Sequence, residues 1–213
     1  MGPRPRHNGA MVESPDAFVP PPENIAELAD ACVRFVERAT SLTLDYTPET
    51  LPFLDHWVRE MKEKPAHEIL SLVGPTAGAY FGEVVRRAHP NVRWRAEGDD
   101  FQRFRLEYEN CFLHFNPIGV AVEAITMREA AGWSSHFQML AEDADAVAAS
   151  LQNSGPVRED DYFRFAVRFE TVDQVFAVLS SLALSRGEGA RRFGPEVYAA
   201  IDDDRPPPGG MTH

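Results

Sequence analysis

The sequence predicts an α+β fold: N-terminal helices packed on a small antiparallel sheet of three to four strands, with a mostly helical C-terminal half. Three observations support this prediction. Residues 75–89 repeat apolar side chains at helical spacing, residues 92–115 alternate apolar and charged side chains as half-buried strands do, and helical spacing returns after residue 140. Hydrophobic residues make up 44% of the 213-residue chain, which is enough for a core.

Composition predicts the domain organisation. Residues 1–22 are rich in proline and poor in large apolar side chains, and residues 202–213 consist mainly of Asp, Pro and Gly. Such segments cannot bury enough apolar surface to fold, so we expect a disordered leader and a disordered tail. Between them we predict one α+β domain over residues 23–201, with sub-lobes at 23–126 and 127–201 as the alternative.

Two helices are predicted before the centre of the chain. The first runs from Glu23 to about Ser41, and its buried stripe consists of Ile25, Leu28, Cys32, Phe35 and Val36. The second has Thr47 as its cap and Pro48 in its first turn. It is expected to run to about Lys64, because Pro65 then ends it.

The central stretch contains a helix with two closely spaced glycines. Gly74 and Pro75 predict the end of one helix and the start of another, which runs to His89. Gly78 and Gly82 lie on one face of this second helix, and each costs about 1 kcal/mol relative to alanine in a helix interior. We therefore expect another element to approach the bare backbone closely at both glycines.

Glu83 is the one acidic residue between Ile69 and Val85. Three interpretations stay open for it. It forms a surface ion pair with Arg87 one turn later, or it is buried and holds a neighbouring backbone segment or Arg93, or it is a catalytic or binding carboxylate.

The run GAYFGEVVRR, which ends at Arg87, is followed within a few residues by a strand that carries Trp94. Together with the preceding LDYTPETLPFLD, it resembles a bacterial family of unknown function whose members share a helical G-A-Y-L/F-G-E-V motif and then a short antiparallel sheet. The resemblance covers roughly residues 43–126. It implies a fold of helices followed by hairpins, and it implies no activity.

The sheet is predicted from residues 92–115. Strands at 92–96 and 104–108 are joined by a turn at 97–100, and residues 111–115 pair back as a third strand. The second strand is expected to be half-buried, with a charged outer face made by Arg103, Arg105, Glu107 and Glu109. Residues 120–126 fit either a fourth strand or the start of a helix, and we favour the strand.

Helices dominate the predicted C-terminal half. Residues 141–152 form one helix, and residues 160–186 are predicted to form a single long helix. A strand at 162–169 followed by a helix is the alternative for that segment, because Phe163, Phe165, Val167 and Phe169 also alternate. Residues 195–201 add one helical turn.

Charge and composition exclude several function classes. The net charge of −12 argues against a nucleic-acid partner, since phosphate binding relies on basic side chains. The chain has no 18-residue apolar run, so we expect no membrane partner and a cytoplasmic location. Cys32 and Cys111 lie within apolar patterns and are expected to be buried thiols.

No catalytic, metal-binding or phosphate-binding motif is recognisable, and no cofactor is predicted. His56, Glu60, Glu63 and His67 have metal-ligand side chains at helical spacing, but Pro65 interrupts the helix that a shared ion would need, so no metal site is predicted. The candidate binding residues are Tyr80, Glu83, Trp94 and Arg95, and the candidate catalytic residues are Glu83 and His114.

The sequence therefore favours a non-enzymatic protein–protein interaction module. Its protein partner is expected to be basic, and the module acts either as an adaptor or as an acidic inhibitor of the immunity type, which neutralises a toxin. The alternative is an enzyme of unrecognised type that uses Glu83 and His114, with Tyr80 or Arg95 nearby. The sequence leaves the oligomeric state open.

Overall fold

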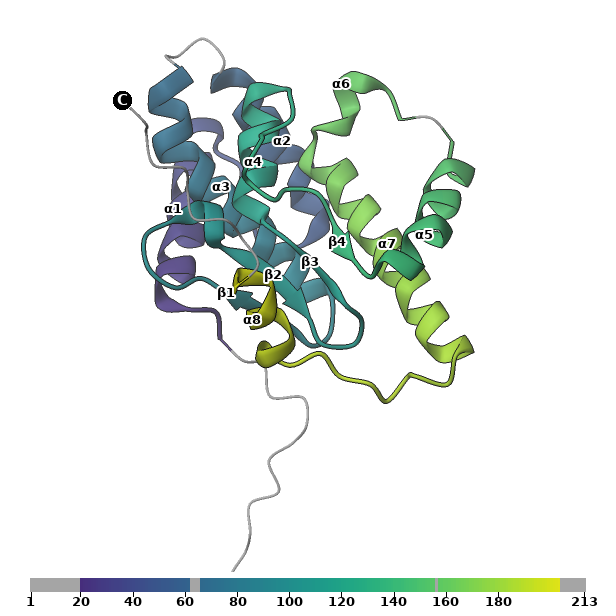
Figure 1. The fold of residues 1–213 in the computed structure, drawn as a ribbon. Coiled ribbons are helices and arrows are strands. Elements are labelled where there is room, and N and C mark those ends of the chain that lie inside the picture. Colours follow the sequence, from purple (N-terminus) through teal and green to yellow (C-terminus); the bar gives the residue numbers. More distant parts are fainter. Residues whose placement is uncertain (1–19, 62–65, 156, 204–213) are drawn as a thin grey trace, which may run out of the picture.

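The computed structural model describes residues 20–61, 66–155 and 157–203 (Figure 1). Most of the predicted leader, 1–22, and most of the predicted tail, 202–213, lie outside the described residues. The described residues form a four-stranded antiparallel sheet with helices on both of its sides, and the C-terminal half is helical. The predicted α+β fold is confirmed.

The two N-terminal helices lie where the sequence predicts them. Helix α1 spans Glu23–Thr40, and α2 spans Leu51–Glu60 after the short 3₁₀ helix η1, Pro48–Thr50. Thr47 occupies the predicted N-cap position of η1, but its side chain makes no capping bond. The Thr47 hydroxyl instead donates to Asp45 Oδ1 at 2.6 Å, and the same oxygen accepts a hydrogen bond from the Thr47 N–H at 2.9 Å, which fixes the turn before the helix.

Helix α3, Ala66–Ala88, runs through the predicted break. Pro75 lies inside the helix, so the prediction that Gly74 and Pro75 separate two helices is wrong. A residue before proline is disfavoured in a helix partly because its Cβ collides with the proline ring, and Gly74 has no Cβ. The Thr76 hydroxyl donates to the Leu72 and Val73 carbonyls, each at 3.1 Å, which supplies side-chain bonds where the proline removes a main-chain donor.

The sheet consists of β1, Val92–Arg95, β2, Arg105–Tyr108, β3, Leu113–Phe115, and β4, Gln138–Met139, in that order. The three predicted strands are confirmed, and each pairs antiparallel with the next. The register pairs Trp94 with Leu106 on the inner face and Arg93 with Glu107 on the outer face. The inner face packs against α3, where the Trp94 ring lies against Gly82.

The segment favoured as a fourth strand is a helix, and this prediction is wrong. Helix α4 spans Pro117–Thr126. Asn116 caps it, because its Oδ1 accepts hydrogen bonds from the Ile118 and Gly119 N–H groups at 2.9 and 3.3 Å, and Pro117 occupies the first helical position. The fourth strand is β4, which pairs with β3 from a segment for which no strand was predicted.

The C-terminal half contains α5, Ala141–Asn153, α6, Glu159–Tyr162, α7, Phe165–Ser185, and α8, Pro195–Asp203. The predicted single helix over residues 160–186 is interrupted at Phe163 and Arg164. The cause is a tertiary contact. The Asp55 carboxylate of α2 accepts hydrogen bonds from the Phe165 N–H at 2.7 Å and the Ala166 N–H at 3.2 Å, so a new helix begins there.

The outer face of the sheet is charged as predicted, but α8 covers it (Figure 1). Arg105 is 7% exposed and Glu107 is 2% exposed, so the predicted half-buried strand is in fact buried on both faces. Tyr198 of α8 is fully buried on this face. Its hydroxyl donates to the Tyr108 carbonyl at 2.6 Å, and its ring stacks on Phe112 with the ring centroids 5.0 Å apart.

The expected close approach at the two glycines of α3 is confirmed. A Cβ added to Gly78 would lie 2.4 Å from the Cα atom of Ile118 in α4, and one added to Gly82 would lie 2.1 Å from the Trp94 ring. Larger side chains at either position would therefore push α4 or β1 away from α3.

One hydrophobic cluster contains residues from both halves of the chain, from Ile25 in α1 to Leu179 in α7. Cys32 and Cys111 are free, buried thiols, as predicted. The single-domain organisation over residues 23–201 stays a prediction that this continuous cluster supports. No helix within the described ranges combines the length and the apolar character that crossing a membrane requires.

Candidate functional site

Glu83 is a buried carboxylate with several partners. It is 1% exposed, so the carboxylate is buried as the second interpretation held, and the ion pair with Arg87 that the first interpretation expected forms at this buried carboxylate rather than at the surface. Its oxygens accept hydrogen bonds from Arg86 Nε at 2.7 Å, Arg86 Nη2 at 2.8 Å and Trp94 Nε1 at 2.8 Å. Arg87 Nε lies 3.5 Å away. The partners thus come from α3 and β1. Arg93, which the sequence suggested as a partner of Glu83, instead bonds Glu107 and Glu109.

Tyr80 holds the loop before α2. Its hydroxyl accepts a hydrogen bond from the Tyr46 N–H at 3.0 Å and lies 2.7 Å from the Thr50 hydroxyl. Burial raises the pKa of Tyr80 to about 12. Tyr46 adopts a positive φ of 65°, which is uncommon for a residue other than glycine, and the Arg87 guanidinium lies 3.7 Å from the centre of its ring. The Tyr80 hydroxyl therefore fixes a strained loop.

The remaining candidate residues lie on two faces of the sheet. Trp94 lies on the inner face with Tyr80 and Glu83, whereas Arg95 follows it on the outer face, opposite Arg105. His114 also lies on the outer face, in register with Glu107 and edge-on to the Tyr198 ring at 5.7 Å. Glu83 and His114 are thus separated by the sheet, and the predicted shared catalytic site is not formed.

The charged side chains of the outer face form a network. Glu107 bridges Arg93 Nη2 at 2.9 Å and Arg105 Nε at 2.8 Å. Arg93 also pairs with Glu109 at 2.9 Å, and Arg105 donates to the Tyr198 carbonyl at 2.9 Å. These bonds attach α8 to the sheet, and they satisfy the charges that its docking buries.

A second buried ion pair joins α4 to α7. Glu123 and Arg168 are both almost fully buried, and Arg168 Nη2 lies 2.7 Å from Glu123 Oε2. Glu123 Oε1 also accepts hydrogen bonds from the Ser135 hydroxyl at 2.7 Å and the Ala130 N–H at 3.2 Å. The pair therefore fixes the loop between α4 and β4.

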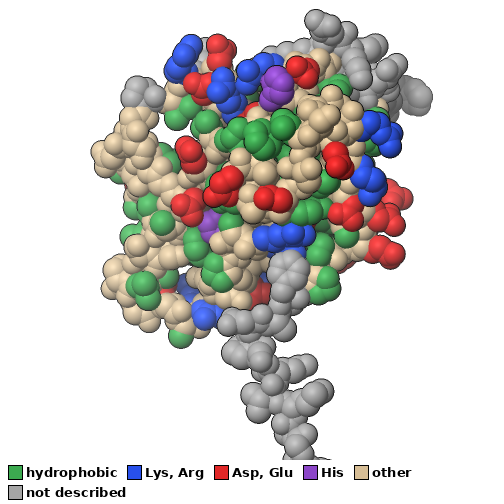
Figure 2. Space-filling model, turned by 180° about the vertical axis from the view of Figure 1, so that it is seen from behind, with side chains coloured by type: hydrophobic (Ala, Val, Ile, Leu, Met, Phe, Trp, Pro, Cys, Tyr) green, Lys and Arg blue, Asp and Glu red, His purple; other side chains and the backbone are tan. Residues whose placement is uncertain are grey.

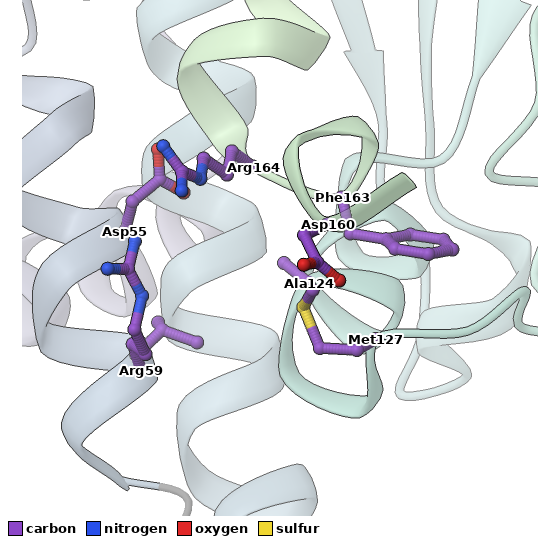
Figure 3. Close-up of a pocket in the computed structure, with 8 residues that line it drawn as sticks. Asp55, Arg59, Ala124, Met127, Asp160, Phe163 and Arg164 are labelled. Atoms are coloured by element: carbon purple, nitrogen blue, oxygen red, sulfur yellow. The ribbon is translucent and has the colours of Figure 1, made fainter. Parts of the chain in front are cut away.

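A cleft of about 310 Å³ opens where α2, α4 and α6 end (Figure 3). Its walls combine charged and apolar side chains, contributed by Asp55, Val58, Arg59, Ala124, Met127, Asp160, Phe163 and Arg164. The cleft exists because three elements end beside it. Helix α2 ends at Glu60, and α4 ends at Thr126, where the following residue, Met127, adopts a left-handed conformation (φ 54°). The chain then turns at Phe163 between α6 and α7.

The charges of the cleft differ in how far they are neutralised. Burial raises the pKa of Asp55, while its hydrogen bonds from Phe165 and Ala166 and the nearby Arg164 and Arg59 oppose that rise. Arg164 itself pairs with Asp161 at 2.8 Å. Within the described part of the chain, Arg59 and Asp160 form neither an ion pair nor a hydrogen bond. Figure 3 shows these two side chains on opposite walls of the cleft.

Sequence reasoning did not identify this cleft. It predicted a continuous helix through Phe163 and a strand where α4 lies, so two of the three element ends were missing. Asn116 followed by Pro117 was a local signal for the start of α4. No local signal marked the start of α7, because its cap, Asp55, comes from another helix 110 residues earlier.

A second charged feature lies at the surface. Six exposed carboxylates, which we call the acidic edge, come from α1 and from the turn after β1: Glu23, Glu27, Asp30, Glu97, Asp99 and Asp100. The Asn24 side chain donates to the Ala96 carbonyl at 3.2 Å, which holds the turn beside α1. Figure 2 shows acidic side chains gathered at the right-hand edge, where α1 lies in that view. None of the six forms an ion pair among the described residues.

The described residues contain no group of three His, Cys, Asp or Glu side chains placed to hold a metal ion. His56 and Glu60 lie 3.3 Å apart on the exposed face of α2. Glu63 and the side chain of His67 lie outside the described part of the molecule. Burial raises the pKa of the Cys111 thiol to about 12, which makes it a poor nucleophile.

Comparison with known proteins gives a family and no activity. The model of a family described as "Family of unknown function (DUF6278)" matches residues 3–109, just over half of the chain. This match includes the GAYFGEVVRR run and ends after β2. No curated protein and no solved structure matches the chain.

Proposed function

The chain belongs to the DUF6278 family of unknown function, and we propose that it is a non-enzymatic protein-binding module whose acidic edge captures a basic partner protein. The observation that carries this proposal is the contrast between the acidic edge and the interior. The six edge carboxylates have no arginine partner among the described residues, whereas the buried carboxylates Glu83, Glu107 and Glu123 each do.

The arrangement of the charges supports a role in binding. Glu23, Glu27 and Asp30 recur at intervals of four and three residues, so they lie along one face of α1. Unpaired carboxylates that lie together produce a negative potential, which raises the association rate with a basic protein and disfavours acidic ones. The net charge of −12 adds to this effect over longer distances.

The fate of the predicted catalytic residues also favours binding over catalysis. The Glu83 oxygens are occupied by Arg86 and Trp94, and the sheet separates Glu83 from His114. Two uses of a binding module fit these observations: an adaptor, or an inhibitor of the immunity type that neutralises a basic toxin. They differ in one respect, because only the inhibitor abolishes an activity of its partner.

The test is affinity capture with the tagged full chain from its own host at low and high salt. It compares the natural protein with two triple variants of equal charge. One changes the acidic edge (Glu23→Gln, Glu27→Gln, Asp30→Asn), and the other changes exposed, unpaired carboxylates elsewhere (Glu129→Gln, Asp145→Asn, Glu170→Gln). We expect one basic protein to be captured at low salt, to be lost at high salt, and to be lost by the edge variant alone.

Equal capture by both variants would overturn the assignment of the acidic edge. Absence of any enriched basic protein would overturn the proposed function. Once a partner is captured, adding the natural protein to an assay of that partner's own activity separates the inhibitor from the adaptor.

A further inference from the structure

We propose that the cleft between α2, α4 and α6 binds a small zwitterion with an apolar substituent, which is the chemistry of a free apolar α-amino acid. This inference concerns a different surface from the acidic edge and does not rest on the proposed protein-binding function. It follows from the size of the cleft, from two charges on opposite walls that form no ion pair or hydrogen bond with a described residue, and from the apolar side chains that also line the cleft.

The size of the cleft limits its ligand to a small molecule. Its volume of about 310 Å³ lies at the lower end of the roughly 300–1,000 Å³ range of ligand pockets. A single amino acid fits within this volume.

Arg59 provides the site for a carboxylate. Its guanidinium lines the cleft from the last turn of α2, and no described residue forms an ion pair or a hydrogen bond with it. The nearest carboxylate of the same wall, Asp55, already accepts two main-chain hydrogen bonds from α7. A guanidinium binds a carboxylate through two parallel hydrogen bonds, which makes arginine the preferred residue for this purpose.

The second arginine of the cleft is engaged elsewhere. Arg164 pairs with Asp161 at 2.8 Å, and it also lies close enough to Asp55 to oppose the rise in that residue's pKa. Arg59 also lies close enough to Asp55 to oppose that rise, but it forms no ion pair with a described residue. Arg59 is therefore the arginine of this wall that can bind an external anion.

Asp160 provides the site for an ammonium group. It belongs to α6, is exposed, and has no described cationic partner. Figure 3 places its carboxylate across the cleft from Arg59. An anion alone would leave Asp160 without a partner and would be repelled by it. A ligand that carries both charges satisfies both walls.

Half of the residues that line the cleft are apolar. Val58 and Ala124 are buried, and Met127 and Phe163 are half-buried, and all four line the cleft. A methionine and an aromatic ring adapt to different apolar shapes. We therefore expect selection for apolar substituents in general, with weak discrimination among leucine, methionine and phenylalanine.

The test is isothermal titration calorimetry of the full chain with L-leucine, L-methionine and L-phenylalanine. We expect saturable binding in the micromolar to millimolar range for at least one of them. For the best ligand, two analogues separate the charges: the amino acid amide lacks the carboxylate, and the deaminated acid lacks the ammonium group. Each analogue should bind at least about tenfold more weakly than the amino acid itself.

Matched variants locate the binding site. Arg59→Gln and Asp160→Asn should each raise the dissociation constant of the amino acid at least about tenfold, because each removes one charge-assisted contact. Arg34→Gln, an exposed arginine on α1, should leave the affinity unchanged. Both cleft residues are exposed and unpartnered among the described residues, so these variants should retain the natural thermal unfolding midpoint.

Three results would overturn the proposal. The first is no saturable binding of any of the three amino acids at about 10 mM, which is above the weakest expected dissociation constant. The second is binding that neither cleft variant weakens. The third is equal affinity for the deaminated acid, because the ligand class would then be a simple carboxylate.

Discussion

The interior and the acidic edge contain the same kind of side chain in opposite surroundings. Inside, Glu83, Glu107 and Glu123 each lie within 2.8 Å of an arginine nitrogen. At the edge, six carboxylates have no such partner among the described residues. Interior charges join elements that are distant in the sequence. The edge charges form no ion pair among the described residues, and only Asp30 and Asp100 accept hydrogen bonds there, from the Tyr46 hydroxyl and the Gln102 N–H.

The interior pairs specify how the elements are arranged. Glu83 joins α3 to β1, Glu107 joins two strands and the segment leading to α8 through Arg93 and Arg105, and Glu123 joins α4 to α7. A buried ion pair is weak evidence for net stability, because desolvation offsets the attraction between the charges. Removing one partner is a different matter, because the other charge then stays buried without compensation.

The largest expected effect is therefore that of Glu123→Gln. The substitution keeps the size of the side chain but leaves Arg168, which is 3% exposed, without its counter-ion. We expect the free energy of unfolding to fall by about 3–5 kcal/mol. Urea denaturation followed by circular dichroism measures this change.

The matched control is Glu129→Gln, in the loop that follows α4. Glu129 is exposed and unpaired within the described ranges, so its substitution should leave the denaturation midpoint unchanged. If both variants unfold at the same urea concentration, the distinction between interior and surface charges does not hold.

A smaller effect on the free energy of unfolding is expected at two buried tyrosines, which differ in their hydrogen bonds. The Tyr80 hydroxyl bonds the Tyr46 N–H and the Thr50 hydroxyl, whereas the Tyr108 hydroxyl makes no hydrogen bond in the described part of the chain. Tyr80→Phe should lower the free energy of unfolding by about 1–2 kcal/mol, because it leaves a main-chain donor without its acceptor. Tyr108→Phe should leave it unchanged or raise it by up to about 1 kcal/mol.

Thermal and urea unfolding of the two phenylalanine variants measure this difference directly, since both substitutions remove one oxygen from a buried ring. A larger loss for Tyr108→Phe than for Tyr80→Phe would show that the Tyr108 hydroxyl has an important partner, such as a bound water molecule.

Local sequence signals predicted much of the N-terminal half. The spacing of Gly78 and Gly82 indicated a close approach of other elements, and α4 and β1 do lie against these glycines. The resemblance to a family of unknown function led to Tyr80, Glu83 and Trp94, and Glu83 and Trp94 are in direct contact. These features could be predicted because each depends on the chemistry of a short segment.

The failures share one cause, which is a contact from a distant part of the chain. Asp55 starts α7 where the apolar spacing indicated an uninterrupted helix, and Tyr198 buries a strand face that would otherwise be exposed. The cleft is a consequence of the same kind of contact, because it lies where α6 and α7 separate. Helix α4 is different: Asn116 and Pro117 indicated it, but the β-branched residues that follow favoured a strand.

The smallest expected effect concerns His89, an interior group without the partners that the buried carboxylates have. Its Nε2 makes no hydrogen bond among the described residues, and its ring packs against Tyr108, Phe169 and Phe176. Burial lowers the pKa of His89 from its ordinary value of 6.5, and the nearby Asp173 only partly opposes this change. The folded protein therefore favours the neutral form of His89 more than the unfolded chain does.

The sign of the pH dependence follows from this depressed pKa. Below about pH 6.5 the unfolded chain binds a proton that the folded protein resists, so the stability that is present above this pH falls as the pH decreases. One such group changes the free energy of unfolding by at most about 1.4 kcal/mol per pH unit. His89→Phe should flatten the profile between about pH 7.5 and 5.5. His56→Gln, which removes an exposed histidine, is the matched control. If His89→Phe loses stability on acidification as steeply as the natural protein, another group is responsible, and the aromatic surroundings of His89 tolerate its charge.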